Sequence, residues 1–392
     1  MVNEQITIKL QINPANDIAA MHDRASVNTR AYEILKPFYR HMVDIGCLSH
    51  ALSNVGKTFD VPHLKAFEES YNSALKLSGK ARRSFKAIVG FSLNTGTRTR
   101  WYTAWENYRD IMQNFQKIQE WIDNCAELDT CKSNVEKMRN IVYKTNSRDD
   151  MIIELCVIVD FAERFVLATY NLEGDGFLAP FVFDQIQDLI YSVQMVRVSA
   201  NQNTDEVFLH FPNISMVIRE LLGQNRSAYA LVKLKNVIRR MIKYFFERFD
   251  LNSGILKMEL ELFRCLKLLN PENHKHNEYG AEDIEKLCRF TPFQSMRNDL
   301  IKELPVMKRL AANFESSHDI LLWFKQRSDE IGTWYEAAKL CALIQPSSGS
   351  AERAFSLLEI AQNENQSSSL LDYQETSIML RYNRQMREVE SK

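Results

Sequence analysis

The stretch Trp101-Tyr-Thr-Ala-Trp105-Glu-Asn-Tyr108-Arg-Asp-Ile-Met112-Gln-Asn-Phe115 decides the fold class of this chain. Its large apolar residues recur at spacings of three and four, which is the period of an amphipathic helix. The same period returns from Asp149 to Asn171, from Phe181 to Met195 and from Ser227 to Phe249. The 392 residues include only 12 glycines and 9 prolines, the residues that interrupt helices most strongly. The sequence therefore predicts a mainly α protein.

The first fifty residues depart from this helical pattern. Two short apolar runs, Ile18 to Met21 and Val43 to Cys47, flank a helix-like segment from Ser26 to Tyr39. This order predicts two parallel strands joined by a helical crossover, because parallel pairing needs a connection of about a dozen residues or more.

Composition argues against several classes of protein. A formal net charge of -1 disfavours a strongly basic nucleic-acid binder, so any DNA contact must be local. No run of about 18 apolar residues appears, and the first residues lack the pattern of a signal peptide. The 7 cysteines follow no zinc or disulfide spacing. These features predict an intracellular protein with reduced, mostly buried thiols and no membrane partner.

Two acidic residues stand where catalytic carboxylates are often found. Asp23 follows the first apolar run, and ligand sites often lie at such strand ends in α/β sheets. From local sequence alone, a turn or helix-start aspartate ahead of Ser26 is the commoner explanation. Glu352 is predicted in the first turn of a helix with Ser350 as its N-cap, where the helix macrodipole alone favours a negative charge. A metal role for either residue requires further carboxylates at the same point.

Three other groups of residues each allow a binding role beside a structural one. Cys47 and His50 have the spacing of two zinc ligands, but a structural zinc site needs four ligands and the sequence offers no second pair. This favours a buried thiol at Cys47 and a hydrogen-bonded imidazole at His50. Arg98, Arg100 and Trp101 suit phosphate contact and base stacking, although an ion pair beside a core tryptophan is commoner. Two basic runs are typical of solvated helix faces. They are Lys80, Arg82, Arg83 and Lys86, and Lys233, Lys235, Arg239, Arg240 and Lys243.

The order of these features resembles the hAT superfamily of DNA transposases. Two late stretches closely match the family's carboxy-terminal dimerisation region: Pro346-Ser-Ser-Gly-Ser-Ala-Glu-Arg-Ala-Phe-Ser-Leu-Leu358 and Leu371-Asp-Tyr-Gln-Glu-Thr-Ser-Ile-Met-Leu-Arg-Tyr-Asn383. Earlier, the block from His22 to Asn28 resembles the segment that holds the second catalytic aspartate. Cys47-Leu-Ser-His50 resembles the CxxH motif of the family, and Thr99-Arg-Trp101 its Thr-Arg-Trp motif.

This resemblance implies a partial RNase H-like α/β core interrupted by a large all-helical insertion domain. Residues 1–57 and 326–392 would supply the core, and residues 58–325 the insertion. Asp23 and Glu352 match the second and third carboxylates of an Asp-Asp-Glu metal site. Arg100 and Trp101 match residues that handle a flipped base at the transposon end, and Arg98 joins them as a predicted DNA contact. Self-association would use Phe355, Leu358, Leu371, Tyr373, Ile378 and Tyr382.

The chain departs from the family at its start. The family's first catalytic aspartate lies on a strand well upstream of the Asp23 block, and neither Asp17 nor Glu4 has such a context. The family's amino-terminal zinc finger has no counterpart either. Because the chemistry of two metals needs all three carboxylates, we expect a catalytically incomplete protein that requires no cofactor. An unpaired sheet edge is also expected to destabilise the amino-terminal region.

These expectations combine into one leading function and two alternatives. The leading function is a transposase-derived protein that acts through dimerisation, with a nuclear location implied by the resemblance. The first alternative is a metal-dependent hAT transposase, known here from a truncated gene model, which would use Mg²⁺ or Mn²⁺. The second is a DNA-binding regulator that uses the helical insertion.

Overall fold

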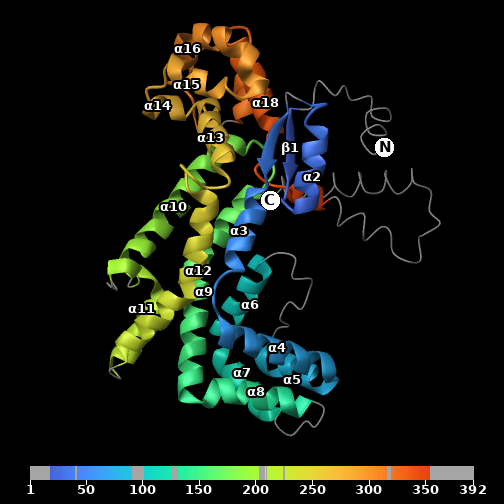
Figure 1. Ribbon diagram of the computed structural model, residues 1–392, viewed down its shortest axis with the longest axis vertical. Helices are drawn as coiled ribbons and strands as arrows, with labels where there is room; N and C mark the ends of the chain where they lie inside the picture. The colour runs from blue at the N-terminus through green and yellow to red at the C-terminus, as the bar shows by residue number, and fades with distance from the viewer. Residues whose placement is uncertain are drawn as a thin grey trace, which may run out of the picture. The chain divides into compact units, whose positions relative to one another are not determined.

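The computed structural model describes residues 18–39, 42–90, 101–125, 131–202, 208, 210–223, 226–315 and 319–353. The chain divides into two compact units. The first consists of Met1–Ser49, Tyr170–Asp184 and Met258–Lys392, and the second of His50–Thr169 and Gln185–Lys257. Helices dominate both units, which confirms the mainly α prediction (Figure 1). The predicted three-part division and the RNase H-like core stay predictions.

The first unit begins with a small parallel sheet. Strand β1 (Ala19–His22) pairs with β2 (Val43–Gly46), and Ala19 lies opposite Val43 in the register. Helix α2 (Ser26–Leu35) joins the two strands. This arrangement confirms the predicted strand, helix and parallel strand. Within the described residues the sheet has these two strands alone.

Helix α2 carries an apolar face that the described residues leave open. Val27, Ile34 and the nearby Phe38 are 76%, 58% and 77% exposed, whereas Tyr32 on the other side is buried. The spacing of Val27 and Ile34 places them on one stripe of α2, and Phe38 lies in the turn that follows the helix. The predicted instability of this region stays a prediction.

The other regular elements described in the first unit are helices. Its elements are α13 (Lys257–Leu266), η4 (Lys267–Leu269), α14 (Asn273–His276), α15 (Ala281–Leu287), η5 (Thr291–Met296), α16 (Arg297–Ala311), α17 (Ile320–Lys325) and α18 (Gly332–Leu343). Trp334 of α18 is 1% exposed and donates its indole N–H to Leu300 O in α16 at 3.2 Å. Glu303 of α16 accepts from Thr333 Oγ1 at 2.7 Å and from the Thr333 and Trp334 amides. The Glu303 carboxylate thus accepts from amides in the first turn of α18, which have no acceptor within the helix, and it holds α18 against α16.

His274 makes the stability of this helical region depend on pH. Its Nε2 donates to Leu268 O at 2.8 Å, and its buried Nδ1 has no hydrogen-bond partner among the described residues. Burial lowers the pKa of His274, and the charge of Lys308 lowers it further. The folded protein therefore holds this ring neutral at a pH where the unfolded chain, with a histidine pKa of about 6.5, takes up a proton.

We expect the His274→Gln variant to lose part of the acid sensitivity of the wild type. Below about pH 6.5 the unfolded chain binds one more proton at His274, so stability falls as pH falls, by up to about 1.4 kcal/mol per pH unit. Thermal midpoints at pH 7.5 and pH 5.5 measure the slope for both proteins. Equal slopes would show that His274 does not carry this dependence.

The second unit is built of helices alone in its described residues. They are, whole or in part, α3 (Leu48–Gly56), α4 (Pro62–Leu77), α5 (Gly79–Val89), α6 (Trp101–Gln113), α7 (Phe115–Asn124), α8 (Lys132–Tyr143), α9 (Thr145–Leu172), α10 (Ala179–Gln202), α11 (Pro212–Gly223) and α12 (Ser227–Phe249). No described helix of the protein is long and apolar enough to cross a membrane. The predicted helical stretches coincide with α9, α10 and α12, but Phe115 belongs to a separate helix because the chain turns at Asn114.

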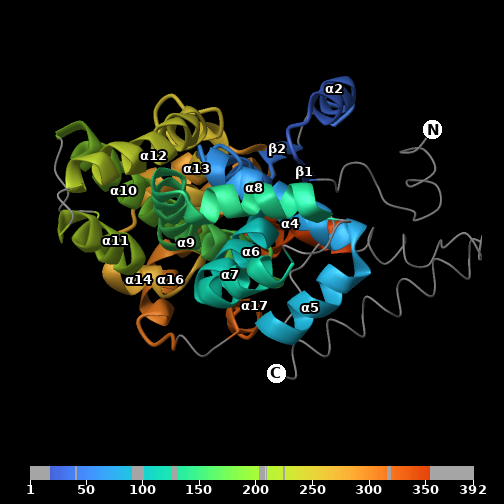
Figure 2. The same cartoon turned by 90° about the horizontal axis from the view of Figure 1, so that it is seen from below.

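These helices pack in pairs around aromatic side chains. α4 packs on α8, α5 on α7 and α11 on α12, and Figures 1 and 2 show the first four gathered together. Trp121 of α7 is fully buried against the rings of Tyr71 and Phe85, with ring centroids 5.5 and 5.2 Å away. Its indole N–H donates to Ala81 O at 3.1 Å, so burial leaves no polar atom of the ring unsatisfied.

Two buried acids of α9 fix the starts of other helices. Glu154 accepts from the Leu64 amide at 2.8 Å near the start of α4, and burial raises the pKa of this carboxyl. Asp160 accepts from the Asn213 and Ile214 amides at 2.8 and 2.9 Å at the start of α11. Each carboxylate faces the positive end of a helix dipole, which offsets the cost of its burial.

Candidate functional site

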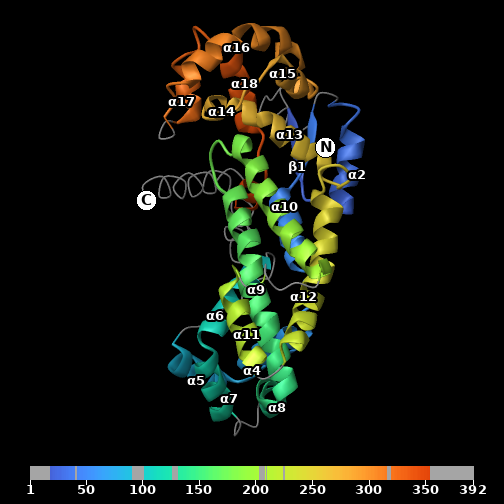
Figure 3. The same ribbon diagram turned by 90° about the vertical axis from the view of Figure 1, so that its left-hand side faces the viewer.

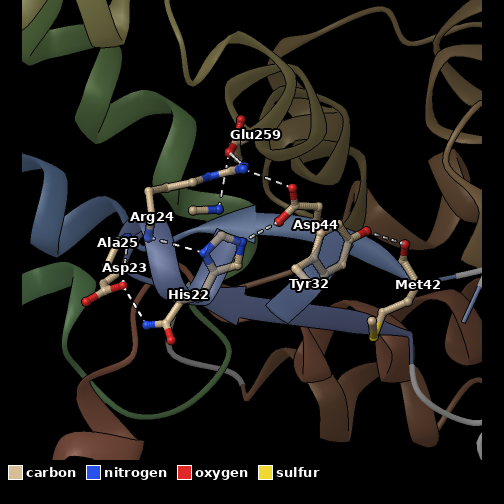
Figure 4. Close-up of polar contacts among 10 residues, drawn as sticks. His22, Asp23, Arg24, Ala25, Tyr32, Met42, Asp44 and Glu259 are labelled. Carbon is tan, nitrogen blue, oxygen red and sulfur yellow. Dashed lines mark hydrogen bonds and ion pairs between the residues drawn. The ribbon is translucent and has the colours of Figure 1, made fainter. Parts of the chain in front are cut away.

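Polar and charged side chains meet on one face of the two-stranded sheet. His22 Nε2 lies 2.9 Å from Asp44 Oδ1. Arg24 donates to Asp44 Oδ2 at 2.9 Å and to Glu259 Oε1 (Figure 4). Glu259 comes from α13 and also accepts from the Gly46 amide at 3.2 Å. We call His22, Arg24, Asp44 and Glu259 the sheet-face network.

Arg24 is the centre of this network. Its side chain is 32% exposed and that of Glu259 is 2% exposed. Burial lowers the pKa of the Arg24 guanidinium, but the charges of Glu259 and Asp44 more than offset this, so its pKa is raised. Arg24 has a φ of 61°, a left-handed conformation that costs on the order of 1 kcal/mol for a residue with a side chain. The two carboxylates therefore hold a permanent cation on a strained piece of backbone.

Asp23 lies directly after β1, at the strand end where the sequence predicted it. Its Oδ1 accepts from the Ala25 amide at 2.9 Å and from Asn28 Nδ2 at 2.8 Å. Figure 4 shows this carboxylate turned away from the sheet-face network. These contacts are typical of an aspartate that closes a turn before a helix. The turn role is therefore visible in the structure, and a catalytic role for Asp23 stays a prediction.

Glu352 lies in a helical run that begins at Gly349. Its Oε1 accepts from Ser348 Oγ at 2.7 Å, and its amide donates to Ser348 O at 3.0 Å. The prediction of Ser350 as the N-cap is wrong, because Ser348 precedes the first helical residue. Ser348 also contacts Cys47 Sγ through its amide at 3.3 Å and its hydroxyl at 3.4 Å. Because Cys47 follows β2, these contacts connect Glu352 to the carboxy end of β2, next to the strand that Asp23 follows.

The sheet-face network does not fit a divalent cation. Both oxygens of Asp44 face a base, and Oε1 of Glu259 already binds Arg24 and an amide. A metal ion here would meet the fixed positive charge of Arg24 at close range. Among the residues that the structure describes, no group of three His, Cys, Asp or Glu side chains is placed to hold a metal. The described side chains on this face of the sheet are therefore arranged for ion pairing and not for metal binding.

Trp101 begins α6 and packs against neighbouring residues of the second unit. Its indole stacks on Phe59, with ring centroids 5.7 Å apart, and its amide donates to Ser53 Oγ at 3.1 Å. A Cβ atom on Gly56 would lie 2.1 Å from the ring, so only glycine fits there. Trp101 also lines a cavity of about 350 Å³, together with Lys57 and Lys65. The indole is thus packed as a structural residue, and its predicted contact with DNA stays a prediction.

Several predicted site residues lie outside the described residues. They are Arg98, Arg100, Phe355, Leu358, Leu371, Tyr373, Ile378 and Tyr382. Of the residues noted for zinc, Cys47 is buried and forms no disulfide, as is true of the other 6 cysteines, which confirms the prediction of buried, reduced thiols. Lys80, Arg82, Arg83 and Lys86 are exposed on α5, as expected of a solvated helix face.

Sequence reasoning missed the sheet-face network. His22 and Arg24 flank Asp23 in the quoted block, and Asp44 interrupts an apolar run, so a charged residue on a short strand was the available signal. Glu259 lies 235 residues from Arg24 along the chain, and no local pattern links the two.

Comparison with known proteins matches one part of the chain. Residues 297–383 match the hAT family C-terminal dimerisation region. A search of curated proteins finds no match to the chain. The matched range begins at the first residue of α16 and includes α17, α18 and the helical run from Gly349. This match assigns residues 297–383 to that dimerisation region, and it supports the placement of the chain among hAT-family, transposase-derived proteins.

Proposed function

We propose that this protein acts by self-association through residues 297–383, and that this chain does not by itself cut DNA. The match to a dimerisation region carries the first part of the proposal. The contacts of Trp334 and Glu303 support the proposed self-association, because they hold α16 and α18 of that region in a fixed arrangement. Phe355, Leu358, Leu371, Tyr373, Ile378 and Tyr382 are the apolar residues that we propose for the contact between copies.

The remaining part of the proposal concerns the ancestry and chemistry of the sheet. Two parallel strands, a crossover helix and an aspartate after the first strand are consistent with part of an RNase H-like core. Cleavage of DNA by that class of fold needs carboxylates that share Mg²⁺ or Mn²⁺ ions. The acids of the sheet-face network are instead paired with the Arg24 guanidinium, and Asp44 also contacts the His22 ring, which supports a structural role for this face. Nuclear location and DNA contact remain proposals taken from the resemblance alone.

Light scattering after size-exclusion chromatography tests the self-association. We expect a particle of twice the chain mass, 45.7 kDa per copy, at micromolar concentration. The same sample, incubated with supercoiled plasmid and Mg²⁺ or Mn²⁺, is expected to leave the plasmid intact. A clean monomer would overturn the dimerisation proposal. Nicking that disappears in both the Asp23→Ala and the Glu352→Ala variant would overturn the proposed lack of cleavage.

A further inference from the structure

A cavity of about 570 Å³ lies between α10 and α12 in the second unit. Two rows of α12 side chains line it. Lys235, Arg239 and Lys243 form a basic row, and Ile238, Ile242 and Phe246 form an apolar row, each with a spacing of four residues. Because residues four apart lie on one face of a helix, the rows run side by side along α12. The volume lies within the range of about 300–1,000 Å³ that is usual for small-molecule sites.

The opposite wall of this cavity, the α10–α12 pocket, comes from the end of α10. Figure 3 shows this part of α10 beside α12. The Arg197 guanidinium lies over the Phe246 ring, 4.9 Å from its centroid. This contact fixes a fourth cation next to the apolar row. Ala200 lines the same wall with a short side chain, which leaves the volume open.

The charge of the pocket favours an anion. Its lining holds four cationic residues and two acidic ones, Glu247 and Asp250. Asp250 is already engaged, since its Oδ1 accepts from the Asn252 and Ser253 amides at 2.9 and 2.8 Å, and these bonds lower the pKa of its carboxyl. Glu247 lies at the far end of the basic row, 3.9 Å from Lys243. The end nearest Lys235 and Arg239 is therefore the positive one.

The spacing of the basic row indicates the kind of anion. A helix rises about 1.5 Å per residue, so neighbouring members of the row are about 6 Å apart along its axis. Two such cations can both contact one short chain of phosphates, whose charged oxygens are spread along its length and form strong charge-assisted hydrogen bonds. In the adjacent apolar row, Ile238 and Ile242 are only 2% and 8% exposed, so half-buried Phe246 offers most of the surface for a flat or apolar group in the same ligand.

We propose that the α10–α12 pocket binds a small organic phosphate. The phosphates lie along Lys235, Arg239 and Lys243, and the organic body lies against Ile238, Ile242 and Phe246. This binding site is separate from the self-association region and does not depend on it.

Isothermal titration of the full chain with ATP as the probe tests the proposal. ATP is expected to bind more tightly than adenosine, which lacks the phosphates, and more tightly than tripolyphosphate, which lacks the organic body. The double variant Arg239→Glu/Lys243→Glu is expected to weaken ATP binding about tenfold or more, because charge-assisted contacts are lost. Ala200→Phe, which fills the cavity without changing its charge, should weaken it as well.

A matched control is available on the same helix. Arg240 is exposed on α12 but does not line the pocket, so Arg240→Glu should leave ATP binding unchanged. If Arg240→Glu weakens ATP binding as much as the double variant does, the loss reflects the overall charge of the protein and the proposed site is wrong. Absence of ATP binding, or equal binding of tripolyphosphate and ATP, would overturn it too. If a 20-base-pair DNA duplex binds more tightly than ATP and loses affinity in the double variant, the surface binds nucleic acid and the small-ligand proposal fails.

Discussion

Trp334→Ala is expected to lower the free energy of unfolding of the α16–α18 region by about 3–5 kcal/mol, the usual cost of truncating a buried aromatic side chain. Trp334 is 1% exposed, and its ring meets that of His274 at a centroid distance of 5.5 Å. The variant also removes the hydrogen bond that the indole N–H donates to Leu300 O. Because α16 and α18 lie in residues 297–383, self-association is expected to fail together with the fold. Hydrogen exchange of peptides from α16 and α18, followed by light scattering, measures both effects.

Two variants separate this prediction from a general effect of substitution. Leu343→Ala lies on the same helix at a position that is 63% exposed, so it should change stability by no more than about 0.5 kcal/mol. Trp334→Phe keeps much of the buried ring but loses the hydrogen bond. Its loss of unfolding free energy should therefore lie between those of Trp334→Ala and Leu343→Ala. Unchanged exchange in Trp334→Ala would contradict the packing described for α18.

Glu259→Leu is expected to destabilise the sheet by about 3 kcal/mol. The substitution removes the acceptor of the Gly46 amide and leaves Arg24, among the described residues, with Asp44 as its one acidic partner. Removal of one partner of a buried ion pair typically costs about 3–5 kcal/mol, and the remaining Asp44 contact places this case at the lower end. Exchange of the β2 amides, including that of Gly46, should become roughly a hundredfold faster.

A control and a double variant sharpen the second prediction. Glu261 lies on the same helix and pairs with half-exposed Arg264, so Glu261→Leu should cost less than about 1 kcal/mol. The variant Glu259→Leu/Arg24→Leu removes the unpaired cation as well, and its cost should be smaller than the sum of the two single costs. Additive costs would show that Arg24 and Glu259 do not stabilise the sheet as a pair.

Local patterns were sufficient to predict much of the fold. The parallel pair β1 and β2 follows from two apolar runs separated by a helix-like segment, because few other arrangements satisfy that order. The bounds of α12 agree with the predicted Ser227 to Phe249, since its apolar period runs without a break. The turn at Asn114 was not predicted, because apolar spacing continues across it from Met112 to Phe115.

The candidate site was less accessible from sequence. Asp23 could be placed after a strand, but its hydrogen bonds to Ala25 and Asn28 depend on a backbone turn that apolar patterns do not encode. The sheet-face network includes Glu259, which lies on α13, far from the two strands along the chain. Long-range pairs of this kind arise from tertiary packing, and a single sequence contains no local signal for them.

The hydrogen bonds between the first strands and residues far along the chain affect folding during translation. The Leu48 amide donates to Pro346 O at 2.9 Å, and the Gly46 amide donates to Glu259 Oε1 at 3.2 Å. A ribosome that adds about 5–20 residues per second needs on the order of tens of seconds to reach these partners. During that time the strands lack both of these contacts. Nascent chains should therefore require chaperones until translation is nearly finished.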